Sequence, residues 1–105
     1  MLGAIAGFDW DAGNRDKCRK HGLSLEEVES VVAHNETLIV PDVEHSLIEH
    51  RLIAVGRVPS GRYALVVFTL RQKGGMTLVR PISARPMHAK EVRKYEKEIS
   101  DPQNR

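Results

Sequence analysis

The sequence has a single cysteine, Cys18, and no long run of apolar residues. One cysteine cannot form an internal disulfide, whereas small secreted domains usually depend on several such bonds. About 18 consecutive apolar residues would be needed to span a membrane. The start, MLGAIAGF, has no basic residue and too short an apolar run for a signal peptide. We therefore expect a cytoplasmic protein that makes no membrane contact.

The sequence also lacks the signatures of nucleotide and metal sites. It has no strand-turn-helix GxGxxG motif and no P-loop. Asp42, Glu44, His45, Glu49 and His50 are metal-binding residue types, but their spacing fits no known ligand pattern. We expect no cofactor and no metal. An enzyme with a metal at His45 and His50 is an alternative that a chelator would reveal.

The composition that remains is typical of one globular domain. The 105 residues are 41% hydrophobic and 29% charged, and no segment is repetitive or low in complexity. A chain of this length has room for one core. We predict a single domain over residues 1–105, with frayed ends at residues 1–3 and 100–105.

Charge is distributed unevenly, although the net charge is only +2. Residues 24–50 contain no lysine or arginine, whereas residues 71–97 contain eight basic residues against only Glu91 and Glu96. This polarity indicates a face that binds a polyanion or an acidic partner. The ordinary alternative is a solvated helix together with solvated strand ends.

Local start and stop signals predict three helices. Asp11 has the side chain of a helix N-cap, and Gly22 can end the short helix that runs to residue 20. Ser24 and Glu27 have the spacing of a capping box, which starts a second helix ending near His34. The third helix is predicted over residues 88–98.

The other apolar segments have the pattern of β-strands. Short strands are predicted at residues 4–8 and 37–40, and longer ones at 51–58, 63–71 and 76–85. The segment 63–71 should be central, and Pro81 favours an edge or a bulge in the last strand. Tight turns join the last three strands into a meander. The predicted fold class is α+β: one antiparallel sheet of four to five strands with two N-terminal helices and a C-terminal helix.

Strand parity places arginines at the ends of the predicted strands. The strand 51–58 has one near each end on a single face, and Arg71 ends the next strand. Arg80 and Arg85 are five residues apart, so a regular strand would point them to opposite faces unless a bulge intervened. Guanidinium groups fit phosphate, and several on one face indicate a contact surface for RNA or DNA. Taken singly, each arginine could equally be a solubilising residue.

Several segments together resemble a known family. In chain order they are FDWD at 8–11, KHGLSLEE at 20–27, RLIAVGR at 51–57, LVVFTLR at 65–71 and ISAR at 82–85, followed by Glu91 and Tyr95. This ordered set resembles the BrnT family of toxins and extends from about Phe8 to Glu96.

The resemblance implies a RelE-like fold and a metal-independent ribonuclease that arrests translation as the toxin of a type II toxin-antitoxin system. It implies a BrnA-type antitoxin partner that covers the toxin and carries the DNA-binding part, so that contact with DNA is indirect. It allows a dimer of toxin-antitoxin pairs. It also implies RNA contact and cleavage at Arg57, Arg71, Arg80 and Arg85, supported by Trp10, Lys20 and His21.

The chemistry of RNA cleavage agrees with these residue types. RNA carries its own nucleophile, the 2′-hydroxyl, and cleavage needs a base, an acid and cations that stabilise the phosphorane. His88, Tyr95, Lys20 or His21 could transfer the protons, and the sequence does not choose among them. Lys94 is a further predicted RNA contact beside Tyr95. A non-catalytic nucleic-acid or partner-binding module with a basic face is the alternative function.

Overall fold

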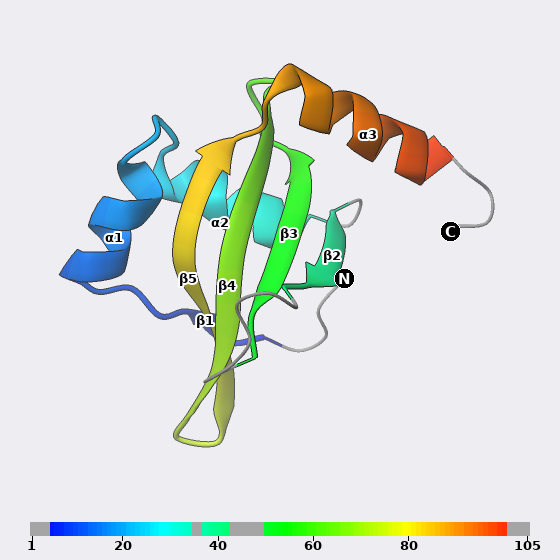
Figure 1. The fold of residues 1–105 in the computed structure, drawn as a ribbon. Coiled ribbons are helices and arrows are strands. Elements are labelled where there is room, and N and C mark those ends of the chain that lie inside the picture. The colour runs from blue at the N-terminus through cyan, green and yellow to red at the C-terminus, as the bar shows by residue number, and fades with distance from the viewer. Residues whose placement is uncertain (1–4, 35–36, 43–49, 101–105) are drawn as a thin grey trace.

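The computed structural model describes residues 5–34, 37–42 and 50–100. Residues 1–3 and 101–105, for which we predicted fraying, lie outside the described residues, whereas Ser100 is the last residue of a helix. Figure 1 shows how the helices and strands are arranged. In chain order they are β1 (Gly7–Phe8), α1 (Ala12–Arg19), α2 (Leu25–Ala33), β2 (Leu38–Pro41), β3 (Leu52–Arg57), β4 (Tyr63–Lys73), β5 (Met76–Pro86) and α3 (Ala89–Ser100).

The strands form one sheet in the order β1-β5-β4-β3-β2. From β2 to β5 each strand pairs antiparallel with its neighbour, and β4 is the central strand, as predicted. The turn between β4 and β5 is Gly74-Gly75, with φ angles of 58° and 78°. Glycine adopts these angles without steric cost, which allows a tight two-residue hairpin.

The prediction of a purely antiparallel sheet is wrong, because β1 pairs with β5 in parallel. Gly7 lies opposite Leu78, and Phe8 lies opposite Val79. A parallel pair needs a long connection, and every element from α1 to β4 lies between these two strands in the sequence. Since β1 is only two residues long, its own residues do not specify the direction in which it pairs.

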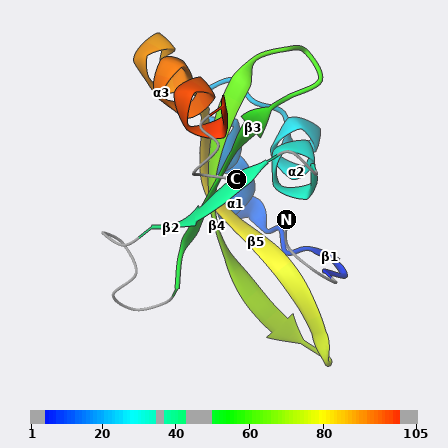
Figure 2. The same cartoon turned by 90° about the vertical axis from the view of Figure 1, so that its right-hand side faces the viewer.

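The helices also differ from the predicted arrangement of two N-terminal helices and one C-terminal helix around the sheet. α1 and α2 both cover the same face of the sheet (Figure 1). The strand predicted ahead of the first helix is present as β1. α3 continues from the end of β5 and extends on the opposite side of the sheet (Figure 2). Its described side chains offer few apolar groups beyond Val92 and Tyr95, so α3 has little to bury against a sheet face.

α1 and α2 begin at capping boxes. In α2 the Ser24 hydroxyl accepts from the Glu27 N–H at 3.0 Å, and the Glu27 carboxylate accepts from the Ser24 N–H at 2.9 Å. The predicted start of α2 is thereby confirmed. Asp11 caps α1 as predicted, and Asn14 completes a second box with it. No helix in the described residues is long and apolar enough to cross a membrane.

The core lies between these two helices and the sheet face that they cover. It is formed by Cys18, Leu23, Val28, Val31 and Val32 from the helical part and by Ala54, Val58, Ala64, Val66, Phe68, Val79 and Ala84 from the sheet part. Cys18 is completely buried, as the sequence predicted, and burial raises the pKa of its thiol to about 11. Its role is therefore packing, because a reactive thiol needs a lowered pKa.

β5 has one more residue than β4 in the segment where the two strands pair. Val67 lies opposite Ser83 and Phe68 lies opposite Pro81, so Ile82 is the extra residue of a β-bulge. Proline has no N–H to donate to a neighbouring strand, and the bulge predicted at Pro81 is confirmed.

The bulge places Arg80 and Arg85 on the same face of the sheet. Arg80 lies opposite Thr69 and Arg85 lies opposite Leu65. Thr69 and Leu65 are four residues apart in one strand, so their side chains share a face, and opposite residues share it too. Residues five apart would point to opposite faces of a regular strand. The extra residue of the bulge is therefore what brings Arg80 and Arg85 to the same face.

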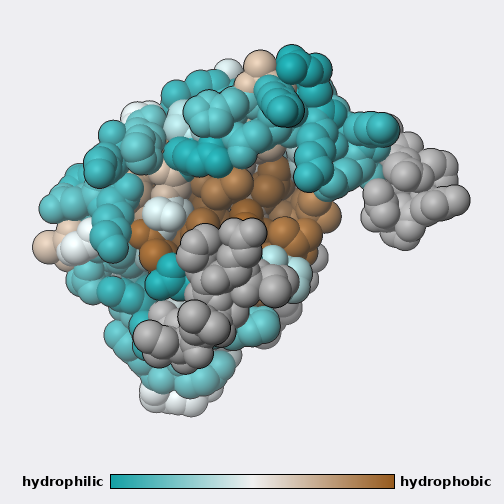
Figure 3. Space-filling model, viewed as in Figure 1, coloured by the Kyte–Doolittle hydropathy of each residue, from teal (hydrophilic) through white to brown (hydrophobic). Residues whose placement is uncertain are grey.

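The sheet face that α1 and α2 leave uncovered is called the open face below. Figure 3 shows an apolar area in the middle of this face with hydrophilic residues around it. The register gives its rows, which are Val55, Leu65 and Arg85, then Ile53, Val67 and Ser83, then Thr69 and Arg80, and finally Arg71 and Leu78. Aliphatic side chains thus occupy the middle, and arginines lie at the β5 side and at one end.

Candidate nucleic-acid interface

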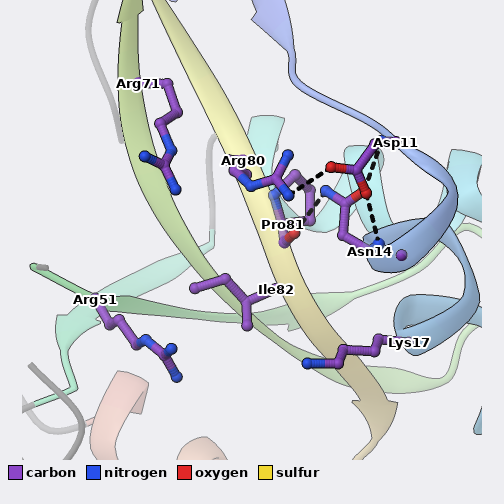
Figure 4. Close-up of a pocket in the computed structure, with 9 residues that line it drawn as sticks. Asp11, Asn14, Lys17, Arg51, Arg71, Arg80, Pro81 and Ile82 are labelled. Atoms are coloured by element: carbon purple, nitrogen blue, oxygen red, sulfur yellow. Dashed lines mark hydrogen bonds and ion pairs between the residues drawn. The ribbon is translucent and has the colours of Figure 1, made fainter. Parts of the chain in front are cut away.

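A pocket of about 450 Å³ lies between α1 and the open face, and four cationic side chains line it. Lys17 comes from α1, Arg51 precedes β3, Arg71 lies near the end of β4 and Arg80 is in β5 (Figure 4). The remaining lining residues are Asp11, Gly13, Asn14, Pro81 and Ile82. We call this the cationic pocket.

The strand register explains why three of these cations converge. Arg80 lies opposite Thr69, and Arg71 is two residues further along β4 on the same face. Arg51 directly precedes Leu52, which lies opposite Phe68, so it is at the corresponding end of β3. Guanidinium and ammonium groups form charge-assisted hydrogen bonds with phosphate oxygens. The pocket is therefore suited to a phosphate group.

Arg80 is held in place by two carboxylates. Its guanidinium donates to Asp11 Oδ2 at 2.7 Å and lies 3.4 Å from Asp9 Oδ2. The bond to Asp11 raises the pKa of Arg80. The pKa of Asp11 is lowered, first by the N–H of Asn14 and then by Arg80. Both groups of the Asp11–Arg80 pair are thus stabilised in their charged forms.

A second pocket, of about 440 Å³, lies on the open face beside the first, and Arg51 lines both. Ile53, Leu65 and Val67 give this pocket apolar walls, so we call it the aliphatic pocket. Its other lining residues are His21, Asp42, Ser83, Ala84 and Arg85. Two arginines, an aspartate, a histidine and a hydroxyl therefore surround an apolar surface that is large enough for part of a nucleotide.

Arg85, in the aliphatic pocket, is tied to α3. Its two terminal nitrogens donate to the two carboxylate oxygens of Glu91 at 2.7 and 2.8 Å. Glu91 also accepts from the backbone N–H of His88 at 2.9 Å. These bonds lower the pKa of Glu91 to about 2, with Arg85 as the main cause, and Glu91 raises the pKa of Arg85. The bidentate pair fixes both the arginine and the first turn of α3.

Arg57 lies in another cluster, at the opposite end of the open face from Arg51. Its guanidinium donates to the Tyr63 hydroxyl at 2.7 Å and lies 4.7 Å from the centre of the Tyr63 ring. Tyr63 makes an edge contact with Tyr95 of α3, with 5.5 Å between ring centres. Arg57 and Arg51 are six residues apart on one face, or about 20 Å along a strand.

The structure places the other predicted site residues away from the two pockets. Trp10 packs against the core on the helix side, where its indole N–H donates to Glu29 at 2.8 Å. Lys20 is exposed at the end of α1, and His88 and Lys94 are exposed at α3. Tyr95 is buried in its contact with Tyr63.

Of the predicted residues, four are therefore brought together in adjacent pockets. Arg71 and Arg80 line the cationic pocket, and His21 and Arg85 line the aliphatic pocket. Sequence reasoning missed Lys17 and assigned no site role to Arg51. Strand parity had already put Arg51 on the face of Arg57, but only the structure shows that it lines the same pocket as Arg80.

The described residues contain no group of three or more histidine, cysteine, aspartate or glutamate side chains that could hold a metal ion. Of the alternative metal group, Glu44, His45 and Glu49 lie outside the described residues. Without a metal, the site can supply cations for a phosphorane through the cationic pocket and proton transfer through His21 in the next pocket.

Comparison with models of protein families gives a match over most of the chain. The model of a protein family described as "Ribonuclease toxin, BrnT, of type II toxin-antitoxin system" matches residues 10–91. The matched segment runs from Trp10, before α1, to Glu91 in α3, and it includes every residue that lines the two pockets. No curated protein matches the chain.

Proposed function

Because this chain belongs to the BrnT family of ribonuclease toxins of type II toxin-antitoxin systems, we propose that it is an endoribonuclease that cleaves mRNA and inhibits translation in the cytoplasm. The observation that carries the proposal is the cationic pocket. Lys17, Arg51, Arg71 and Arg80 gather there, next to a second pocket that contains His21. This arrangement supplies what cleavage of a phosphodiester requires.

In the proposed reaction the scissile phosphate lies in the cationic pocket. The 2′-oxygen of the preceding ribose forms a bond to phosphorus and loses its proton to a base, while the bond to the 5′-oxygen breaks and that oxygen takes a proton from an acid. The products are a 2′,3′-cyclic phosphate and a 5′-hydroxyl. The arginines stabilise the extra negative charge of the phosphorane, a role that metal ions have in other nucleases.

Among the candidates for proton transfer, the pocket geometry supports His21 best for one of the two steps, because His21 lines the aliphatic pocket together with Arg85. Arg85 is placed to bind a neighbouring phosphate. The catalytic roles predicted for Arg57, His88 and Tyr95 stay predictions. In this proposal these three residues act on RNA that continues toward α3. Trp10, Lys20 and Lys94 remain predicted supporting contacts.

We further propose that a BrnA-type antitoxin neutralises the chain by covering the open face. The aliphatic middle of that face and its arginines would bind an amphipathic acidic segment, which would exclude RNA. Contact with DNA would occur only through the antitoxin, in a complex that can contain two toxin-antitoxin pairs.

The test is the chemistry of the products. Purified chain is incubated with end-labelled RNA, and with the same RNA carrying single 2′-deoxy substitutions. We expect fragments that end in a 2′,3′-cyclic phosphate, no cleavage after a 2′-deoxy position, and the same rate in the presence of EDTA.

The outcomes separate the alternatives. Salt-sensitive binding of RNA without any cleavage would support the non-catalytic module and contradict the proposed activity. Cleavage that continues after 2′-deoxy positions would exclude attack by the 2′-hydroxyl. Loss of cleavage with EDTA would contradict metal independence.

A further inference from the structure

We propose that Asn14 is a positioning residue that fixes the bulge in β5 and thereby sets Arg80 in the cationic pocket. The inference rests on the proposed function, and it concerns a residue that has no assigned role in it. Asn14 belongs to α1, is 5% exposed, and reaches the sheet through its side chain (Figure 4).

The amide of Asn14 bonds to three separate parts of the chain. Its Nδ2 donates to the Pro81 carbonyl at 2.8 Å and to the Asp9 carbonyl at 2.9 Å. Its Oδ1 accepts from the Asp11 N–H at 2.7 Å. One nearly buried side chain thus joins the N-terminus of α1, the segment after β1 and the bulged part of β5. A nearly buried amide with all its groups bonded specifies geometry strongly, since losing a partner leaves a polar group unsatisfied.

The bond to Pro81 acts directly on the bulge. Pro81 adjoins the extra residue Ile82, where the regular pairing of β4 and β5 is interrupted. The Asn14 amide holds the Pro81 carbonyl there. If β5 closed up into a regular strand, Arg80 and Arg85 would point to opposite faces, because they are five residues apart.

Asn14 also orders both carboxylates that hold Arg80. It fixes the backbone of Asp9 through the Asp9 carbonyl and that of Asp11 through the capping box. The carboxylates of these two residues lie 3.4 and 2.7 Å from the Arg80 guanidinium. The same amide thus controls the side of the sheet on which Arg80 emerges and the direction in which its guanidinium points.

A double-mutant cycle tests whether Asn14 acts through Arg80. The variants are Asn14→Ala, Arg80→Ala and both together, and the ligand is a short fluorescent 2′-O-methyl RNA, which cannot be cleaved. We expect each single variant to raise Kd about tenfold. Each should also make the negative slope of log K, the binding constant, against log salt concentration less steep by about 0.7. This is the change expected when one phosphate contact with a single strand is lost. Asn14→Ala should add nothing in the Arg80→Ala background.

Urea unfolding of the same variants separates this role from a general structural one. The stability cost of Asn14→Ala should persist in the Arg80→Ala background, although its effect on binding disappears there. Gln72→Ala is the control, because the Gln72 amide also links β5 to another element, here β4 through Thr77 at 2.9 Å, and lines neither pocket. If Asn14→Ala does not fold, Asn14→Ser replaces it, since serine is neutral, keeps a polar group at the site and lacks the two amide donors.

Independent effects of Asn14→Ala and Arg80→Ala on binding would overturn the inference and leave the proposed function intact. An Arg80→Ala variant that binds and cleaves RNA as the wild type does would instead contradict the proposed site itself.

Discussion

Two arginines of the open face are held by carboxylates. Arg80 is held by Asp9 and Asp11, and Arg85 is held by Glu91. An arginine that is already fixed loses less side-chain entropy when it binds phosphate, although the carboxylate competes with the phosphate for it. These acids therefore orient the arginines and, in the proposed function, also limit how strongly they bind RNA.

The Arg85–Glu91 pair gives a prediction about stability and pH. The pKa of Glu91 is lowered from 4.5 to about 2 in the folded chain. A lowered carboxyl pKa contributes stability above the unfolded value, and this contribution is lost as the pH falls from 4.5 toward 2. The free energy of unfolding, measured with urea, should therefore decline less over this range in Glu91→Gln than in the wild type.

A direct titration of the Glu91 carboxyl by NMR provides the control. In Arg85→Ala its pKa should rise toward 4.5, and it should stay somewhat below because the His88 N–H bond remains. An unchanged pKa in Arg85→Ala would mean that Arg85 is not the main cause of the shift.

Some of the residues that line the two pockets were predictable from the sequence. Arg71, Arg80 and Arg85 stood out because they lie in strands whose middles are apolar. Lys17 did not, since it reaches the site only through the packing of α1 on β5. The sequence left open whether Arg80 and Arg85 share a face, because one extra residue in β5 decides it and the location of a bulge depends on both strands.

Among the elements, helix starts follow most directly from the sequence. The capping box at Ser24 is a local pattern, and Ser24→Ala removes the hydroxyl that accepts from the Glu27 N–H. We expect a loss of about 1 kcal/mol, or a Tm lower by roughly 4–8 °C for a domain of this size. The measurement is thermal unfolding followed by circular dichroism. Ser60→Ala is the control, because Ser60 is exposed and only weakly bonded to Glu27, at 3.4 Å.

An equal Tm for wild type and Ser24→Ala would show that the cap does not stabilise α2. An equal loss in Ser60→Ala would show that the effect is not specific to the cap.

The bulge of β5 can be removed by deleting Ile82. The pairing of β4 and β5 can then become regular, and Arg80 and Arg85, now four residues apart, still share a face. We expect the deletion variant to retain most of the binding of 2′-O-methyl RNA, as should Ile82→Ala, which keeps the extra residue. A loss of binding as large as in Arg80→Ala would show that the shared face of the two arginines is not sufficient and that the bulge itself is required.

The direction of β1 and the position of α3 were not predictable. β1 has only two residues, so its own sequence does not decide that it pairs in parallel with β5. The pairing depends on how α1, which follows β1, packs against the sheet. α3 is attached mainly through polar contacts of Arg85, Tyr63 and their partners. Neither a two-residue strand nor a helix that is attached by polar contacts has the hydrophobic periodicity from which strand direction or helix docking is predicted.

At the scale of the whole molecule the two faces of the sheet have different roles. The face under α1 and α2 carries the core, where residues such as Val28, Val66 and Phe68 are completely buried. The open face keeps apolar side chains at its middle and gathers cations on one side. The chain thus combines a core on one face of the sheet with an apolar and cationic surface on the other, where we propose that an antitoxin and RNA bind.

The central claim is that the cationic pocket is where RNA is cleaved, and single-turnover cleavage by matched arginine variants tests it most directly. Arg51→Ala and Arg80→Ala should each lower the rate by about 10²-fold or more, since each removes a cation from the phosphorane. Arg19→Ala is the control, because Arg19 also pairs with an aspartate, at 3.2 Å, but lines neither pocket. It should cleave at the wild-type rate. Wild-type rates in both Arg51→Ala and Arg80→Ala would contradict the claim.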